Sequence, residues 1–322
     1  MRTNNQLYSA IKPAKLFYFN GLTYKEQVAY NNLDKAIKAK DKNASLGNII
    51  AEEVNHVIMS YHFDHPEVFY LDFTKMIYTK TFGGITLELK YRHLDKIQEV
   101  NNIISKYLQV IKSKPNIMGR IVAISDIFYN FTYKNSNRYE EHTIFDPVIN
   151  KTGVCEGFGL LFAYLCQLSG IECTVLEGTL KGEKHLWNIV EINRRLYNVD
   201  MTQSLSTNTA NKQVKYAYVL VPTYILEDHK PALRFECESL NDNPFVLLGH
   251  AFNDAKTLHN VIESLTKKGK DFTIFDTSKN KPMSVEEIMR VASKSLVKQV
   301  MWSPRYTRVI VSSGSWVKNL FS

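Results

Sequence analysis

Residues 153–170 read GVCEGFGLLFAYLCQLSG. The large apolar side chains of this stretch recur every three or four residues, which predicts an amphipathic helix. Cys155 lies at the predicted start of the helix, where unpaired backbone N–H groups and a partial positive charge favour a thiolate. Gly170 stands where a left-handed C-terminal cap is expected. The stretch therefore predicts a helix that carries a candidate thiol nucleophile.

The surroundings of Cys155 favour a reactive thiol over a buried structural one. Gly153, Gly157 and Gly159 have no side chains, so a partner strand and the backbone of a substrate can approach the start of the helix closely. A helix terminus contributes about 0.3–1 kcal/mol at an exposed site, so full activation of the thiol requires an imidazolium partner. His185 is the candidate among the nine histidines, because it begins the second strand predicted after the helix.

The hairpin that follows the helix is predicted to bring a histidine and an aspartate together. A two-residue turn at Asn193-Arg194 would join the two strands, and Trp187 would then lie directly opposite Asp200. His185 and Trp187 share one face of their strand because side chains alternate, and Asp200 is diagonal to His185 on that face. A three-residue turn would reverse the parity and separate the two groups.

Together these residues predict a catalytic triad of Cys155, His185 and Asp200. The imidazole would accept the proton of the thiol, and the carboxylate would orient the imidazole and stabilise its charged form. Asp200 could instead hold Thr202 or a loop amide, which would reduce the triad to a dyad. Trp187 is interpreted as a packing lid over the histidine and the aspartate rather than as a substrate contact.

Three motifs, in order along the chain, carry a resemblance to a known family. They are Gly153-Val154-Cys155-Glu156-Gly157-Phe158, His185-Leu186-Trp187-Asn188 and Tyr197-Asn198-Val199-Asp200-Met201-Thr202. Their order and spacing resemble the transglutaminase-like superfamily. The resemblance implies a papain-like core, in which the nucleophile helix packs on an antiparallel sheet that carries the histidine and the aspartate. Leu186 and Gln203 depart from the residues common in the family, which concerns the wall of the cleft and leaves the triad intact.

The expected fold class is α+β, with three parts along the chain. These are an N-terminal α/β region over 1–93, the transglutaminase-like core over 94–228 and a small C-terminal α/β domain over 229–322. Residues 64–71 also resemble a segment found upstream of the core in bacterial members of the family, which implies a bacterial origin.

The pattern of apolar residues predicts the elements within these parts. Helices are expected over 24–40, 47–61, 94–111, 117–131, 154–168, 254–268 and 285–299. Strands are expected over 68–74, 85–91, 171–176, 185–192, 196–200, 271–275 and 307–312, and the first two of them are expected to pair. A polar loop is expected over 134–141.

Composition and charge restrict the class of protein. Hydrophobic residues make up 44% and charged residues 22% of the 322 residues, as in an ordinary soluble globular protein. No apolar run is long enough to cross a membrane and the N-terminus lacks an apolar signal segment, so a cytoplasmic location is expected. The formal charge of +8 is spread along the chain without an arginine-rich run or a nucleic-acid motif, so it predicts a solvated basic surface.

The cysteines and histidines form no metal-binding or disulfide pattern. The four cysteines include no CxxC pair, and three of them are expected to be buried in the core: Cys166, Cys173 and Cys237. Three histidines close in sequence have no carboxylate or thiol at a recognised ligand spacing: His56, His62 and His65. Neither a metal nor a cofactor is therefore expected.

The expected function is acyl transfer through a thioester, with a protein or a peptide as the substrate. Hydrolysis of an amide or peptide bond and transfer to an amine use the same three groups, and they differ in whether water is kept out. From the resemblance, a cysteine peptidase or amidase is favoured and a protein-glutamine transglutaminase comes second. A catalytically silent binding module comes third, because all three residues of the predicted triad are present.

Overall fold

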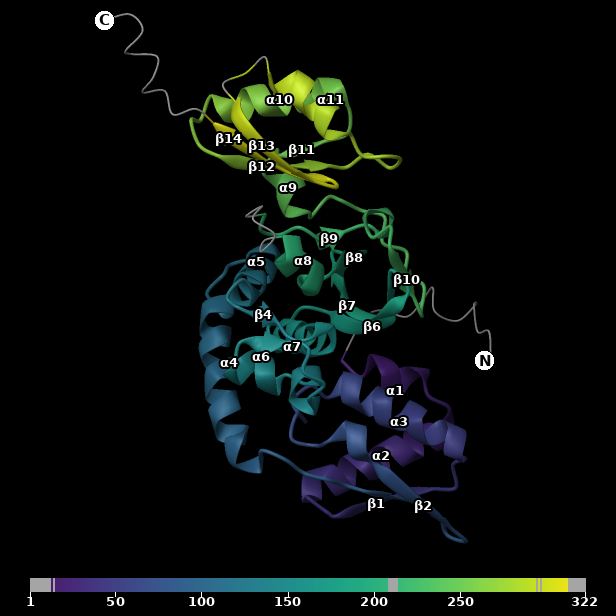
Figure 1. Cartoon of the computed structure of the whole chain (residues 1–322). Helices are drawn as coiled ribbons and strands as arrows, with labels where there is room; N and C mark the ends of the chain where they lie inside the picture. The colour runs from purple at the N-terminus through teal and green to yellow at the C-terminus, as the bar shows by residue number, and fades with distance from the viewer. Residues whose placement is uncertain (1–12, 14, 208–213, 294, 296, 312–322) are drawn as a thin grey trace, which may run out of the picture. The chain divides into compact units, whose positions relative to one another are not determined.

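Figure 1 shows the computed structural model of the chain, which describes residues 13, 15–207, 214–293, 295 and 297–311. Backbone contacts divide the chain into two compact units. The first consists of residues 1–195 and 228–235, and the second of residues 196–227 and 236–322. Both units contain helices and strands, so the predicted α+β class is confirmed. The boundaries placed after residues 93 and 228 stay a prediction.

The N-terminal part of the first unit packs helices against a small antiparallel sheet. α2 (Tyr24–Ala39) begins with a capping box, in which the side chains of Thr23 and Glu26 each accept from the other's backbone N–H. The other helices are α1 (Phe17–Gly21) and α3 (Ala51–Asp64). The sheet has the order β1-β3-β2, with β1 (Asn43–Gly47), β2 (Ile77–Thr81) and β3 (Gly84–Glu88). Apolar side chains from α2, α3 and the sheet form one core, including Leu33, Val57 and Leu87.

The strand predicted over 68–74 is wrong. Leu71 makes an isolated β-bridge, and a 3-10 helix (Phe73–Lys75) follows it. The physical reason is the buried Asp72, whose carboxylate accepts hydrogen bonds from the backbone N–H of Thr74 (3.2 Å) and from Nε of Arg92 (2.8 Å). An aspartate that satisfies the backbone two residues later turns the chain instead of extending it. The strands that pair with β3 are β1 and β2.

The helix predicted over 47–61 begins later than expected, at Ala51. Gly47 ends β1 with a φ of +73°, and the chain then turns, with the N–H of Ile49 donating to the carbonyl oxygen of Gly47 (3.0 Å), before the extended Ile50 leads into α3. The sequence pattern also does not predict β1 and β2. β1 offers two buried side chains, those of Ala44 and Leu46, and every residue of β2 is exposed. Neither strand therefore carries an alternating pattern long enough to be recognised.

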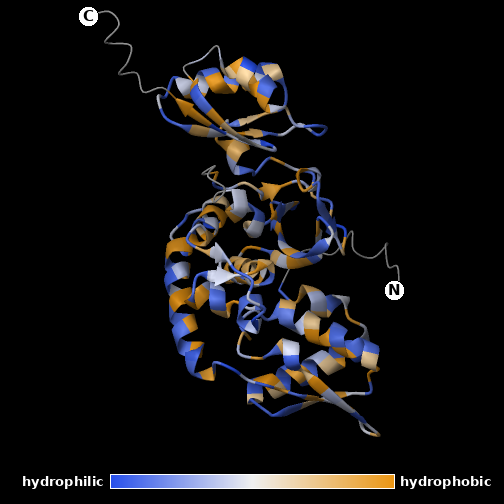
Figure 2. Ribbon diagram, in the orientation of Figure 1, coloured by the Kyte–Doolittle hydropathy of each residue, from blue (hydrophilic) through white to orange (hydrophobic). Residues whose placement is uncertain are grey.

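The helices of the core agree with the prediction. These are α4 (Ile97–Lys112), α5 (Ile117–Phe128) and α7 (Cys155–Leu168), and Gly170 follows α7 with the expected positive φ of 74°. The predicted polar loop over 134–141 contains the start of a 3-10 helix (Tyr139–His142), and further short elements lie on either side of it: β4 (Thr132–Tyr133), α6 (Phe145–Ile149) and β5 (Thr152–Gly153). Within the described ranges, no helix is both long and apolar enough to cross a membrane, and Figure 2 shows hydrophilic residues along α4.

The sheet of the core has the strand order β10-β6-β7-β8-β9. β6 (Cys173–Leu180), β7 (Glu183–Ile192) and β8 (Arg195–Val199) correspond to the three predicted strands, and β9 (Val219–Val221) and β10 (His229–Pro231) add to them. α8 (Met201–Thr207) follows β8. β6 pairs antiparallel with β7 and with β10. α7 packs on β6 and β7, so the predicted nucleophile helix on an antiparallel sheet is confirmed.

The C-terminal part of the second unit is a four-stranded sheet packed with two helices. Its order is β11-β12-β14-β13, with β11 (Ala251–Phe252), β12 (Phe272–Asp276), β13 (Val297–Ser303) and β14 (Tyr306–Val311). The helices are α10 (Ala255–Thr266) and α11 (Val285–Ala292), and α9 (Pro244–Leu247) precedes them.

The helix predicted over 285–299 is too long, because α11 ends at Ala292 and β13 follows. A β-bulge between Val297 and Gln299 shifts the register of β13. Val297 and Val300 consequently both pack on the core although they are three residues apart. That spacing is the one expected of a helix, so the bulge makes the strand look helical in sequence.

Candidate active site

Cys155 is the first residue of α7, and short segments hold the chain that precedes it. The backbone N–H of Val154 donates to the carbonyl oxygen of Glu141 (3.2 Å), and the N–H of Lys134 donates to that of Gly153 (3.0 Å). Val154 is extended, with a φ of −104° and a ψ of 179°, and its side chain forms no capping hydrogen bond. The N–H groups at the start of α7, including that of Cys155, have no acceptor within the helix.

Cys155 is partly exposed, whereas the other three cysteines are buried as predicted: Cys166, Cys173 and Cys237. Burial raises the pKa of Cys166 well above its usual range and the pKa of Cys237 to about 12. Both thiols are therefore expected to stay protonated near neutral pH, and we expect a reagent in solution to reach Cys155 first.

Gly157 allows the 3-10 helix (Tyr139–His142) to approach the first turn of α7. A Cβ at this position would lie 2.4 Å from the carbonyl oxygen of Glu141 and 2.7 Å from that of Thr143. Gly157→Ala should therefore lower the free energy of unfolding by about 1–3 kcal/mol, measured by urea denaturation.

Gly159→Ala on the same helix is the matched control for that substitution. A Cβ at position 159 would have its nearest neighbours at 3.7 to 3.9 Å, which is ordinary van der Waals contact. Alanine also favours a helix by up to about 1 kcal/mol over glycine. Gly159→Ala should leave stability unchanged or raise it. An equal loss in both variants would contradict the account of Gly157.

Asn188 fixes α7 on the sheet. Its side chain is buried on β7 and donates from Nδ2 to the carbonyl oxygens of Gly159 (2.9 Å) and Thr174 (3.3 Å). One amide thus joins α7, β6 and β7. These hydrogen bonds fix the position of α7, and with it that of Cys155, relative to the strand that carries His185.

The turn after β7 is the two-residue turn on which the sequence argument depends. β7 ends at Ile192 and β8 begins at Arg195, and the turn residues Asn193 and Arg194 have φ values of 51° and 65°. Two successive left-handed residues are the signature of a type I′ turn, which suits the right-handed twist of a hairpin. Asp200 follows β8 directly and is fully buried.

His185 lies on β7 in a tightly packed aromatic environment. Its ring stacks with that of Trp187 at 6.0 Å between centroids, and the ring of His229 from β10 approaches both edge-on, at 5.4 and 5.1 Å. Gly178 pairs with His185 across the strands, and a Cβ there would lie 2.6 Å from the Trp187 ring. The Trp187 ring thus packs beside the ring of His185 and leaves no room for a side chain at position 178, across from the histidine.

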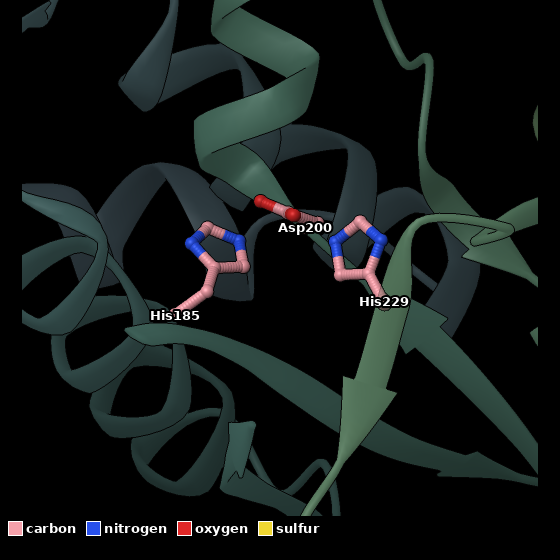
Figure 3. A group of neighbouring side chains, drawn as sticks. All are labelled: His185, Asp200 and His229. Atoms are coloured by element: carbon pink, nitrogen blue, oxygen red, sulfur yellow. The ribbon is translucent and has the colours of Figure 1, made fainter. Parts of the chain in front are cut away.

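Figure 3 shows His185, Asp200 and His229 together, and one ligand atom of each lies within 4.8 Å of the other two. Cys155 is not a member of this group of three. The structure therefore brings two of the predicted site residues near each other and adds His229, which the sequence analysis passed over. Two imidazoles and a carboxylate are donors that divalent transition metals accept. The assignment of Cys155, His185 and Asp200 as a triad stays a prediction.

Glu156, the residue after Cys155, joins three segments of the first unit. Its carboxylate lies 2.9 Å from Nε2 of His62 on α3 and 2.6 Å from Nδ1 of His142. Burial alone would raise the pKa of Glu156, but the hydrogen bonds from the two histidines outweigh it and lower the pKa to about 2. The bond to Glu156 in turn raises the pKa of His142. A charged bridge therefore anchors the first turn of α7.

Raising the pH should weaken this bridge. The pKa of His142 is higher in the folded than in the unfolded chain, so its contribution to stability is complete below about pH 6.5 and is lost as the pH rises through the folded value. The lowered pKa of Glu156 has the opposite sign, and its contribution is lost only as the pH falls from 4.5 towards about 2. The melting temperature should therefore fall as the pH rises above about 6.5 in the wild type, and should fall less in His142→Gln.

His259→Gln is the control for the pH series. His259 lies on α10 with an exposed side chain, 3.9 Å from Glu263. Its removal should leave the pH dependence of the melting temperature unchanged. The same slope in the wild type and in His142→Gln would show that the bridge is not the titrating element.

Residues 106–201 match the Transglutaminase-like superfamily. The matched segment begins within α4, continues through α7 and the β6–β7 hairpin, and ends just after Asp200. It therefore contains all three residues of the predicted triad. A comparison with curated proteins finds no match.

Several solved structures align with the chain at low similarity. A TGase is 13% identical, with 44% of this chain and 47% of that chain covered and a TM-score of 0.32. A candidate cysteine protease from Cytophaga hutchinsonii is 14% identical, with 49% and 65% covered and a TM-score of 0.32. The periplasmic domain of TgpA from Pseudomonas aeruginosa bound to ethylmercury is 14% identical, with 32% and 44% covered and a TM-score of 0.27.

The chain thus spans less than two thirds of the length of each of these proteins. The likeness to the superfamily rests on the matched segment and on its three motifs, which lie in the expected order on α7, β7 and β8. Residues 106–201 of this chain, less than half of its length, are thus similar to the core of the transglutaminase-like superfamily.

Proposed function

We propose that the protein is a cysteine-dependent amide hydrolase, a peptidase or an amidase, with Cys155 as its nucleophile. The observation that carries the proposal is the place of Cys155: it is the partly exposed cysteine, at the start of a helix whose sequence matches the superfamily. A thiol there combines access for a substrate with the positive end of a helix, which favours a thiolate.

The proposed reaction proceeds through a thioester. His185 takes the proton of the Cys155 thiol, and the thiolate attacks the carbonyl carbon of the substrate. His185 then gives its proton to the leaving amine, and the C–N bond breaks. Water, deprotonated by His185, attacks the thioester and releases the carboxylic acid and the thiolate. Asp200 orients the imidazole and stabilises its charged form throughout.

The oxyanion of the tetrahedral intermediate needs a hydrogen-bond donor. The backbone N–H of Cys155 is the proposed donor, because an N–H in the first turn of a helix has no acceptor within the helix and points out of its N-terminus. Extended Val154 and the hydrogen bond from its N–H to Glu141 hold this part of the backbone in place. A preformed donor requires no reorganisation during the reaction.

Selective labelling tests the nucleophile. Partial alkylation with iodoacetamide at pH 7, followed by peptide mass spectrometry, should modify Cys155 before the buried cysteines at 166, 173 and 237. The difference in rate should be at least about a hundredfold, because burial both blocks access and disfavours the thiolate. First modification at any of the other three would remove the basis of the proposal.

A peptide library, incubated with and without a primary amine, separates hydrolysis from transfer. Cleavage or deamidation without added amine is the expected result. Products that require the amine would replace the hydrolase with a transglutaminase, which uses the same three groups. A complete lack of products together with an inert Cys155 would leave a binding module on the same fold.

A further inference from the structure

A pocket of about 170 Å³ opens in the first unit, between α1, α3 and β6. Its walls are largely apolar and include Phe17, Met59, Phe63 and Leu233. An apolar cavity of about 150 Å³ accepts a group the size of benzene. The pocket is therefore large enough for an aromatic ring or for the aliphatic stem of a long side chain.

The walls of the pocket are held by packing and by hydrogen bonds. Phe17 and Phe63 are 3% and 4% exposed, so little of either ring can move. Tyr18 packs against Phe63 with 5.0 Å between ring centroids, and its hydroxyl donates to the carbonyl oxygen of Val175 on β6 (3.0 Å). The pocket is preformed in this structure, which lowers the entropic cost of filling it.

Glu177 places a carboxylate on this apolar surface. Its side chain lines the pocket, and within the described part of the chain it forms no ion pair and accepts no hydrogen bond. Lys184 acts on it through space without forming an ion pair among the described residues. The side chain of Glu177 keeps access to solvent. Partial desolvation beside the pocket, followed by the nearby Glu156, raises the pKa of Glu177.

The other charged groups around the pocket do not supply that partner. His56 lines the pocket, but its Nδ1 is bonded to the buried carboxylate of Glu26 at 2.6 Å. His62 faces Glu156 in the same way, at 2.9 Å. An anionic ligand would meet the Glu177 carboxylate, and a neutral apolar ligand would leave it without a partner. A cation on an apolar stem satisfies both the walls and the acid.

We propose that this pocket binds the side chain of a lysine or an arginine in the substrate, with the stem on the aromatic wall and the cation at Glu177. As a specificity site it rests on the proposed hydrolase, and two observations relate it to the candidate active site. Glu177 pairs across the strands with Leu186, the residue after His185. Glu156, next to Cys155, acts electrostatically on Glu177.

Benzamidine and benzamide test the binding, since they share a ring and differ in charge. The full chain should bind benzamidine at least about tenfold more tightly than benzamide, measured by ligand-observed NMR titration. Glu177→Gln should remove that preference. Ala232→Leu, which places a larger side chain in the wall and narrows the pocket, should weaken the binding of both ligands. Glu172→Gln, an exposed acid just before β6, is the matched control and should change nothing. Equal binding of the two ligands to the wild type, or no binding of either, would overturn the proposal.

A second measurement separates this proposal from the proposed function. Binding needs no chemistry, so Cys155→Ala should bind benzamidine as the wild type does. With peptides that differ by lysine against norleucine, kcat/KM should be at least about tenfold higher for lysine, and Glu177→Gln should abolish the difference. Hydrolysis at equal rates for the lysine and norleucine peptides would refute the role of the pocket in specificity and would leave the proposed hydrolase standing. Glu177-dependent binding without hydrolysis would keep the pocket and remove the hydrolase.

Discussion

Cys155→Ala should abolish turnover of every amide substrate, because a methyl group cannot form the thioester. Removal of the nucleophile from an enzyme of this kind costs about 10⁴-fold or more in kcat. The stability should change little, since Cys155 is partly exposed and packs at the start of α7 rather than in its core. The measurement is single-turnover hydrolysis of a peptide found in the library screen, together with urea denaturation of both proteins.

Cys237→Ala is the control for the loss of a thiol. Cys237 is 3% exposed and burial raises its pKa to about 12, so the protein should keep its activity without it. Residual turnover in Cys155→Ala above one per cent of the wild type would show that the thioester is not the route.

Asp200→Asn should lower kcat by about 10³- to 10⁴-fold while the protein stays folded. An amide has the same shape as the carboxylate but cannot stabilise a charged imidazole, and it can hold the imidazole in the wrong tautomer. The fold should tolerate the change, because Oδ1 of Asp200 accepts from the backbone N–H of Gln203 (3.0 Å) and an asparagine oxygen can do the same. Steady-state kinetics and the melting temperature give the two readings.

A reduction of less than about tenfold in kcat would favour the alternative role of Asp200, that of holding the start of α8 through the backbone N–H of Gln203. In that case Cys155 and His185 would act as a dyad. A loss of folding in Asp200→Asn would leave kcat unmeasurable, and Asp200→Glu, which keeps the charge, should then restore the fold and part of the rate.

Long elements with a full apolar stripe could be predicted from the sequence. α4, α5 and α7 have stripes of three or four turns, and Gly170 supplies the left-handed residue that ends α7. Short elements could not, because their pattern depends on the neighbours they meet. The exposed β2 shows no alternation, and the bulge in β13 imitates a helical spacing.

The candidate site divides in the same way. Cys155, His185 and Asp200 stand in three local motifs, so their residue types and spacing could be recognised. His229 could not be found, because its approach to His185 depends on the pairing of β10 with β6. The same holds for Glu156, whose partners His62 and His142 come from separate segments. Such contacts are set by the packing of distant parts of the chain, which no local pattern encodes.

The rate of Cys155 alkylation, with and without His185, tests the central claim most directly. At pH 7, the wild type should react with iodoacetamide at least about tenfold faster at Cys155 than His185→Ala does, because the variant lacks the imidazolium that stabilises the thiolate. Equal rates in the two proteins would contradict the pairing of Cys155 with His185, and with it the proposed mechanism.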